Sequence, residues 1–306
     1  MAGSEARKDD FVPVAPRAPS GVRARPFLKW AGGKGQLLDQ FRPLLPREHR
    51  SYFEPFVGAA ALFFSLLGRR RGKAVLSDVN RELIDCYLAV QTRVDDVIRA
   101  LAAHVYDSDH YYRVRDVDPA GISLPERAAR TIYLNKAGYN GLYRVNRAGR
   151  FNVPFGRYTN PLLCDADNLR ACSGALAGVR LKVRDFEEVL AHAKEGDFVY
   201  FDPPYVPVSV TAGFTSYAAG GFEWPEQERL AGVFARLASA GVRVMLSNSD
   251  TPAVRRLYAG FRIDTVSAPR SINSNATRRG RVGEVVVRNF DGDRVVRRTR
   301  RSLRKA

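Results

Sequence analysis

Short β-prone runs alternate with longer helical patterns along most of the chain, and this alternation limits the folds that the chain can adopt. Strand-like runs occupy residues 51–57, 73–78, 179–183, 197–202, 242–248, 261–266 and 282–289. One helical pattern covers 225–240, between Pro225 and Gly241, and another covers about 81–104. This alternation favours an α/β fold with a mostly parallel sheet and helices on both faces. Ligands of such sheets bind beyond the carboxyl ends of the strands.

The alternation is interrupted between the second and third strand-like runs. Residues 105–178 contain few strand signals and are rich in Tyr, Arg and Asn, as in NKAGYNGLYR and FNVPFGRY. We interpret residues 85–175 as a mostly helical insertion with a long loop. The sheet domain then comprises residues 27–84 and 176–290. Residues 1–26 and 291–306 are expected to be disordered ends, the second of them strongly basic.

The charge of the chain indicates its partner. The 306 residues include 49 Lys and Arg against 32 Asp and Glu, which gives a formal net charge of +17. Residues 294–306 alone carry seven basic side chains and no acid. An excess of this size favours a nucleic acid as the partner, ahead of an anionic membrane surface. No apolar run approaches the roughly 20 residues of a membrane span, and the first 21 residues lack the apolar core of a secretory signal.

The three cysteines and four histidines are scattered, and no CxxC pair occurs. This distribution argues against a disulfide framework and against a Cys/His zinc site, and it is typical of a reducing compartment. We therefore expect a protein of the cytoplasm that binds neither a metal nor a membrane.

One motif combines the groups needed to bind an amino group on a flat ring. Asp202, Pro203, Pro204 and Tyr205 follow the apolar run FVYF, where a strand is expected to end. The two prolines fix φ and remove two N–H donors, so a carboxylate, a free carbonyl and an aromatic ring come together on a stiff path. A strand-to-loop turn is the alternative explanation, and the tyrosine after a buried strand argues against it.

Two earlier strand ends carry features of a nucleotide site. Phe56 and Gly58 follow the first strand, and a glycine at this bend lets a ligand approach the backbone. The next strand ends at Asp78, the position where nucleotide-binding α/β folds hold ribose hydroxyls. A generic turn and a helix cap explain each feature separately, whereas their spacing of about 20 residues favours a ribose site.

Three further segments are rich in glycine, amides or cations. Residues 29–35, KWAGGKG, fail the P-loop pattern because they lack its first glycine and its Ser or Thr, and they precede the first strand. Residues 135–144 interleave cations, amides and an aromatic ring, which read base edges or wedge between bases. The arginines of residues 270–281 are suited to phosphates. Solvated surface turns remain the alternative for all three.

Together these motifs resemble the Dam-type DNA adenine methyltransferases. FLKWAGGK, EPFVGA, SDVNREL, NKAGYNGLYR, FNVPFGRY, DPPY and RSINSN occur in that family's order, from Phe27 to about Asn289. The resemblance implies a Rossmann-like methyltransferase sheet with residues 85–175 as the target-recognition insertion. It implies transfer of a methyl group from S-adenosyl-L-methionine to the exocyclic N(6) amine of adenine in double-stranded DNA. The complete set of motifs is similar to the branch that recognises GATC.

The matching positions imply roles for individual residues. The catalytic residues would be Asp202, Pro203, Pro204 and Tyr205. The cofactor would be bound by Trp30, Lys34, Phe56, Gly58, Asp78, Asp185, Phe186 and Asp202. DNA would be contacted by Lys29, Tyr139, Asn140, Leu142, Arg144, Pro154 and Arg157. The sequence departs from the family at Ala60, where a second glycine is common, and we expect its methyl group to crowd the cofactor loop.

Other functions are consistent with the same motifs. One is methylation of another exocyclic amine, either cytosine N(4) or an RNA adenine, and another is an inactive DNA-binding homologue, against which the intact DPPY argues. Methylation of cytosine C5 is disfavoured, because that reaction uses a thiolate that usually follows a proline and no cysteine here does. The resemblance requires no protein partner. The expected location is the cytoplasm, at the nucleoid, or a host cytoplasm if the source is viral.

Overall fold

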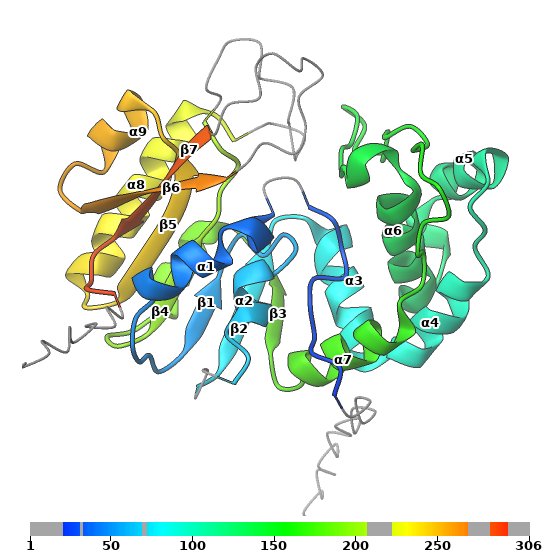
Figure 1. Ribbon diagram of the computed structural model, residues 1–306, viewed down its shortest axis with the longest axis horizontal. Coiled ribbons are helices and arrows are strands. Elements are labelled where there is room, and N and C mark those ends of the chain that lie inside the picture. The colour runs from blue at the N-terminus through cyan, green and yellow to red at the C-terminus, as the bar shows by residue number, and fades with distance from the viewer. Residues whose placement is uncertain (1–20, 31–32, 69–71, 207–221, 269–281, 293–306) are drawn as a thin grey trace, which may run out of the picture.

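A twisted β-sheet forms the centre of the molecule (Figure 1). The computed structural model describes residues 21–30, 33–68, 72–206, 222–268 and 282–292. Its strands are β1 (Tyr52–Glu54), β2 (Ala74–Asp78), β3 (Arg180–Val183), β4 (Phe198–Phe201), β5 (Arg243–Ser249), β6 (Arg262–Ala268) and β7 (Val282–Arg288). The order across the sheet is β3-β2-β1-β4-β5-β7-β6. The first five strands in this order are parallel, and β7 is antiparallel to both β5 and β6. The predicted α/β class with a mostly parallel sheet is confirmed.

Helices cover both faces of this sheet. The α-helices are α1 (Leu38–Phe41), α2 (Ala61–Ser65), α3 (Arg81–Thr92), α4 (Val94–Ala102), α5 (Ser108–Asp116), α6 (Leu124–Ala137), α7 (Ala166–Leu176), α8 (Trp224–Ser239) and α9 (Pro252–Leu257). Short 3-10 helices are η1 (Lys34–Gln36), η2 (Arg42–Leu44), η3 (Pro119–Gly121), η4 (Tyr139–Gly141) and η5 (Phe186–Ala191). The helix predicted over 225–240 is confirmed as α8.

Two apolar cores lie on opposite sides of the sheet, because successive side chains of a strand point to opposite faces. On β1, Tyr52 belongs to the larger core with α2, α3, α6 and α7, while Phe53 belongs to the smaller core with α8 and η5. Both residues are at most 6% exposed, so the strands are buried on both faces. This double burial explains why the strand-like runs in the sequence are almost continuously apolar.

The single helix predicted over 81–104 is wrong, because the chain breaks at Arg93. Its φ of −142° and ψ of 37° end α3 and precede α4. The break gives the two helices separate directions, so that α3 packs against β2 and β3 while both helices also pack against α6. Helical periodicity of apolar residues continued through the break, since both helices bury one face on the same neighbour.

Residues 79–179 connect β2 to β3 and are mostly helical (Figure 1). Helices α4, α5 and α6 form a group at the side of the sheet, and α3 and α7 lie between this group and the strands. The predicted limits of the insertion fall within α3 at residue 85 and in the last turn of α7 at residue 175.

Among the described residues, no helix combines the length and the apolar character needed to cross a membrane. Of the ends predicted to be disordered, 1–26 and 291–306, residues 1–20 and 293–306 lie outside the described residues, as does the arginine-rich segment 270–281. The prediction is wrong for residues 21–26, because Ala24 is buried and the backbone of Arg25 exchanges two hydrogen bonds with the Asn168 side chain.

Candidate active site

Three carboxylate side chains stand at the carboxyl ends of neighbouring parallel strands. Glu54 ends β1, Asp78 ends β2, and Asp202 directly follows β4. The carboxyl ends of parallel strands meet at one edge of the sheet, so these groups line the edge where α/β folds bind ligands. The structure therefore places Asp78 and Asp202 at this edge of the sheet, where the sequence located them.

Asp202 is held by a buried cation and a hydroxyl group. The Nζ atom of Lys34 lies 2.8 Å from Asp202 Oδ1, and the lysine side chain is only 3% exposed. Ser247 Oγ donates to the same oxygen at 2.8 Å and lies 2.9 Å from the Tyr200 hydroxyl. Both contacts involve Oδ1, and Oδ2 has no partner among the described residues. The carboxylate is thus fixed through one oxygen, with the other available to a ligand.

Tyr205 lies beside the same lysine. Its ring centroid is 4.5 Å from Lys34 Nζ, within the range of a cation–π contact, and its hydroxyl donates to Glu284 Oε2 at 2.6 Å. Burial raises the pKa of Glu284, while the ammonium group of Lys34 opposes that rise. The predicted residues Lys34, Asp202 and Tyr205 are therefore brought together, with Glu284 as a further member.

The chain after Asp202 is fixed by polar side chains from α8 and β5. Gln227 donates to the carbonyl of Pro204 at 2.9 Å, and Asn248 donates to Gln227 at 3.0 Å. Asn248 also accepts the backbone N–H of Val206 at 3.2 Å. The carbonyl of Pro203 has no partner in the described part of the chain, so it remains a possible acceptor.

Glu54 is buried directly behind these groups. The hydroxyl of Tyr52 donates to its Oε2 atom at 2.7 Å. Burial raises the pKa of Glu54 to about 8, and the nearby Asp202 carboxylate adds to the rise. Burial thus favours the neutral form of Glu54.

Trp30, Gly58 and Asp78 form a second group. Gly58 has a φ of +44°, and a Cβ atom at this position would lie 2.9 Å from Trp30 Cδ1. Trp30 stacks on Tyr143 with ring centroids 5.1 Å apart. Asp78 accepts the backbone N–H of Asn80 at 3.0 Å, and burial raises its pKa to about 6. A half-buried carboxylate beside a closely packed glycine turn fits a ribose with its hydroxyl donors.

Ala60, the departure from the family, does not lie on the surface of this loop. Its φ is 54°, and it is only 1% exposed, within the larger core. The methyl group therefore fills core volume, which argues against the expected crowding of the cofactor.

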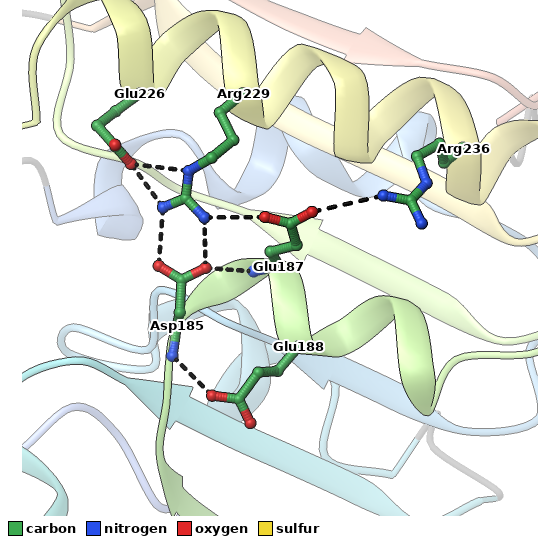
Figure 2. A network of polar contacts seen from close by, with 6 residues as sticks. All are labelled: Asp185, Glu187, Glu188, Glu226, Arg229 and Arg236. Atoms are coloured by element: carbon green, nitrogen blue, oxygen red, sulfur yellow. Dashed lines mark hydrogen bonds and ion pairs between the residues drawn. The ribbon is translucent and has the colours of Figure 1, made fainter.

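Phe56, Asp185 and Phe186 form a third group. The rings of Phe56 and Phe186 stack with centroids 5.3 Å apart, and Phe222 contacts both edge to face. Asp185 caps η5 and is held by two parallel contacts to Arg229 of α8 (Figure 2). An aromatic wall beside a carboxylate suits a purine with an exocyclic amine. Arg229 was missed by the sequence analysis, which treated α8 only as an amphipathic helix.

Most of the residues predicted to contact DNA surround the turn at η4. Tyr139 is 48% exposed, and its backbone N–H donates to the carbonyl of the exposed Pro154 at 2.9 Å. Lys29 is exposed, with Nζ 4.2 Å from the centroid of the Tyr158 ring. A Cβ atom at Gly141 would lie 2.4 Å from Lys29 Cδ, so the turn requires glycine there. The segment that contains Lys29 and the turn at η4 are therefore in direct contact.

The remaining predicted DNA residues lie on or next to the same loop. Asn140 is exposed with a φ of 54°, Leu142 is half-buried, and Arg157 is exposed. The Arg144 guanidinium donates to the side chain of Asn152 at 2.8 Å and to its carbonyl at 3.2 Å. Among the residues predicted to contact DNA, Arg144 is held by hydrogen bonds from its guanidinium group to Asn152 of the same loop.

The described residues contain no group of three His, Cys, Asp or Glu side chains arranged to hold a metal ion.

This chain is similar to known proteins along most of its length. The family profile of the D12 class N6 adenine-specific DNA methyltransferases matches residues 30–272. A type II methyltransferase of Lactococcus lactis subsp. cremoris is 42% identical over 277 residues, which cover 88% of this chain and 96% of that protein. A type II methyltransferase of Methanocaldococcus jannaschii is 40% identical over 88% of this chain and 100% of its own length. A DNA adenine methylase of Salmonella typhi is 36% identical over 86% of this chain and 94% of its own length.

Proposed function

Because this chain belongs to the D12 class N6 adenine-specific DNA methyltransferases, we propose that it methylates adenine N(6) within GATC sites of double-stranded DNA. Family membership makes it an S-adenosyl-L-methionine-dependent enzyme that acts on DNA. The proposal adds the target sequence and the roles of single residues. The proposed residue roles are supported by one observation: Lys34 holds Asp202 through Oδ1 and lies against the ring of Tyr205.

The target amine needs help from the enzyme in two ways. Its lone pair is delocalised into the adenine ring, and inside a duplex it is out of reach, so the base must flip out of the stack. Asp202 Oδ2 then accepts one amine N–H, and the Pro203 carbonyl accepts the other. Together they favour a pyramidal nitrogen, while Tyr205 stacks on the flipped ring. Bound S-adenosylmethionine would supply a methyl group on its positively charged sulfur. The amine nitrogen would bond to the methyl carbon as the carbon–sulfur bond breaks, the neutral thioether would leave, and the Asp202 carboxylate would take up the proton that the amine loses.

The cofactor fits the remaining two groups of side chains. Asp78 accepts from the ribose hydroxyls, with Trp30 and Gly58 shaping the adjoining turn. Phe56 and Phe186 line the adenine side, and Asp185 accepts from its amine. The buried ammonium group of Lys34 fixes the direction of the Asp202 carboxylate.

Target recognition is assigned to the insertion over about residues 85–175 and to Lys29. A lysine in the major groove most often pairs with guanine O(6) and N(7). Lys29 stands next to Trp30, so it is placed for the guanine that precedes the target adenine. Arg144 is placed for the guanine of the opposite strand, and Leu142 and Pro154 for neighbouring groove edges. We place the enzyme in the cytoplasm at the nucleoid, since that is where its DNA substrate lies.

The catalytic assignment is tested with Asp202→Asn, compared with Asp39→Asn on the exposed face of α1. Loss of a hydrogen-bond acceptor for the transition state is expected to lower the rate by roughly 10²–10³, with DNA binding retained. The measurement is transfer of a radiolabelled methyl group to a GATC duplex, with the product nucleoside identified. Turnover of Asp202→Asn close to that of the parent protein contradicts the mechanism. A product on cytosine or RNA supports the alternative substrates.

The target assignment is tested on plasmid DNA. Methylated plasmid should resist an endonuclease that cuts only unmethylated GATC. Lys29→Ala should lose discrimination at the first base pair by about 1–3 kcal/mol, because one base contact is removed. Efficient methylation of duplexes without GATC by the parent protein overturns the assignment and leaves the adenine chemistry intact.

A further inference from the structure

Arg229, on the inward face of α8, binds three carboxylates at once (Figure 2). Its Nη1 and Nη2 atoms donate to the two oxygens of Asp185 at 2.7 and 2.8 Å. Nη1 also donates to Glu187 at 3.1 Å, while Nε and Nη2 donate to Glu226 at 3.2 and 2.6 Å. A guanidinium group has five N–H donors in a rigid plane, and all five are used here. The side chain is thus fixed in position and in rotation.

Asp185 is held by Arg229 and by the start of η5. Oδ1 accepts from Arg229 and from the backbone N–H of Glu187 at 2.8 Å, and Oδ2 accepts from Arg229. The Asp185 side chain also accepts the backbone N–H of Glu188 in a capping box. The side chain is still 38% exposed, so a ligand can reach the oriented carboxylate.

Arg229 also holds the aromatic ring that follows Asp185. Its guanidinium carbon lies 4.1 Å from the centroid of the Phe186 ring, which in turn stacks on Phe56. The hydrogen bonds from Arg229 hold the pKa of Asp185 below its ordinary value, so the carboxylate stays an acceptor through the neutral range. One arginine therefore fixes both the acceptor and the adjoining ring.

We propose that Arg229 is a positioning residue that directs the exposed side of the Asp185 carboxylate at the exocyclic amine of the cofactor's adenine. The inference rests on the proposed role of Asp185 and extends it to selectivity. An amine at the purine 6-position donates to Asp185, whereas the carbonyl of a hypoxanthine ring would face the carboxylate with two acceptors and no proton. The contact from α8 thereby makes the cofactor site selective for adenine.

Arg236 provides a matched control on the same helix. It is 66% exposed and contacts Glu187 alone, at 3.4 Å, so it belongs to the same charge cluster without touching Asp185. Loss of a positive charge from α8 is common to Arg229→Gln and Arg236→Gln, and only the first removes the two contacts to Asp185.

The test measures binding of S-adenosylhomocysteine and S-inosylhomocysteine by calorimetry to the full chain and to Arg229→Gln, Arg229→Lys and Arg236→Gln. The parent protein should prefer the adenosyl ligand by about 10- to 100-fold, the effect of one hydrogen bond to a charged group. Arg229→Gln should lose most of this preference, Arg229→Lys should recover part of it, and Arg236→Gln should retain it. In turnover, Arg229→Gln should raise the KM for S-adenosylmethionine with little change in kcat.

Each other outcome contradicts the inference. Equal weakening of both ligands in Arg229→Gln assigns the arginine to packing alone, and an unchanged preference shows that Asp185 needs no positioning. A parent protein without a preference refutes the role of Asp185 itself. Methyl transfer to DNA by the same parent preparation then still tests the proposed reaction separately.

Discussion

Gly58 and Ala60 stand two residues apart, both in the left-handed region, yet they face different surroundings. A side chain at Gly58 meets the Trp30 ring, whereas that of Ala60 is buried in the core. Gly58→Ala should therefore displace Trp30 and weaken S-adenosylmethionine binding by about tenfold or more, equivalent to at least about 1.4 kcal/mol. Calorimetric titration of the folded variant, with thermal unfolding as a check on folding, measures the effect.

Ala60→Gly is the matched comparison for this prediction. It restores the glycine common in the family without changing the surface of the turn, so the cofactor Kd should stay within about twofold of the parent value. A large gain in affinity would mean that the Ala60 methyl group does crowd the cofactor, as the sequence alone led us to expect.

Asp78 makes cofactor binding depend on pH. Ribose hydroxyls donate to an ionised carboxylate, and burial raises the pKa of Asp78 to about 6. S-adenosylmethionine affinity should therefore rise between pH 5 and pH 7, and the rise should be absent in Asp78→Asn. The folding stability of the free protein should depend on pH in the opposite direction. Asp78 has a higher pKa in the folded than in the unfolded protein, so its contribution to the free energy of unfolding is largest at low pH and is lost as pH rises through 6. If log Kd has the same slope against pH in the parent protein and in Asp78→Asn, the assignment of Asp78 to the ribose hydroxyls is refuted.

Two asparagines join elements that are distant in the chain. On α6, Asn135 accepts from the backbone N–H of Lys29 and donates to the carbonyls of Lys29 and Gly141, all within 3.0 Å. On α7, Asn168 makes the same two-way contact with the backbone of Arg25, at 3.0 and 3.1 Å. Both amides are at most 2% exposed. The segment before η1 is thus fixed to two helices, α6 and α7. Only the contact through Asn135 also includes the turn at η4, at Gly141.

Asn135→Ala should destabilise the protein by about 1–3 kcal/mol, since it leaves buried backbone groups without partners. It should also reduce discrimination at the first base pair of the site, because Lys29 is no longer held against the turn at Gly141. Urea unfolding and methylation rates on GATC and on a duplex altered at the first base pair measure the two effects.

Asn168→Ala controls for stability alone. Its destabilisation should be similar, and its discrimination should remain that of the parent protein. If both variants lose discrimination equally, the loss results from lower overall stability. The hydrogen bonds of Asn135 to Lys29 and Gly141 then have no specific role in base recognition.

The net positive charge of the protein should set the strength of its non-specific DNA binding. Residues 294–306, which lie outside the described residues, carry seven of the basic side chains. Deleting them should weaken DNA binding and flatten the dependence of log K on log salt, because fewer counterions are released. Site preference should not change, since the base contacts are assigned elsewhere. Binding isotherms at several salt concentrations measure the slope, and an unchanged slope would show that the segment does not contact DNA.

Local patterns in the sequence were enough to predict the elements and the chemistry of the strand ends. All seven strands lie where β-prone runs predict them, and Asp78 and Asp202 occupy the expected edge of the sheet. These features are local, since burial on both faces makes a strand apolar along its length and two prolines stiffen the chain wherever they occur. The helix break at Arg93 escaped prediction because both helices keep the same apolar period.

Local patterns do not show which side chains meet, because these contacts depend on how the elements pack. Lys34 and Asp202 form their ion pair across more than half the chain, Asn135 reaches Lys29 across 106 positions, and Arg229 reaches Asp185 across 44. The reversal of β7 between β5 and β6 was likewise not readable from its residues, although it brings Glu284 to Tyr205. Periodicity reports which face of an element is buried, and it carries no information about its partner. Partners are selected when the elements pack, because buried polar groups must find one another as water is excluded.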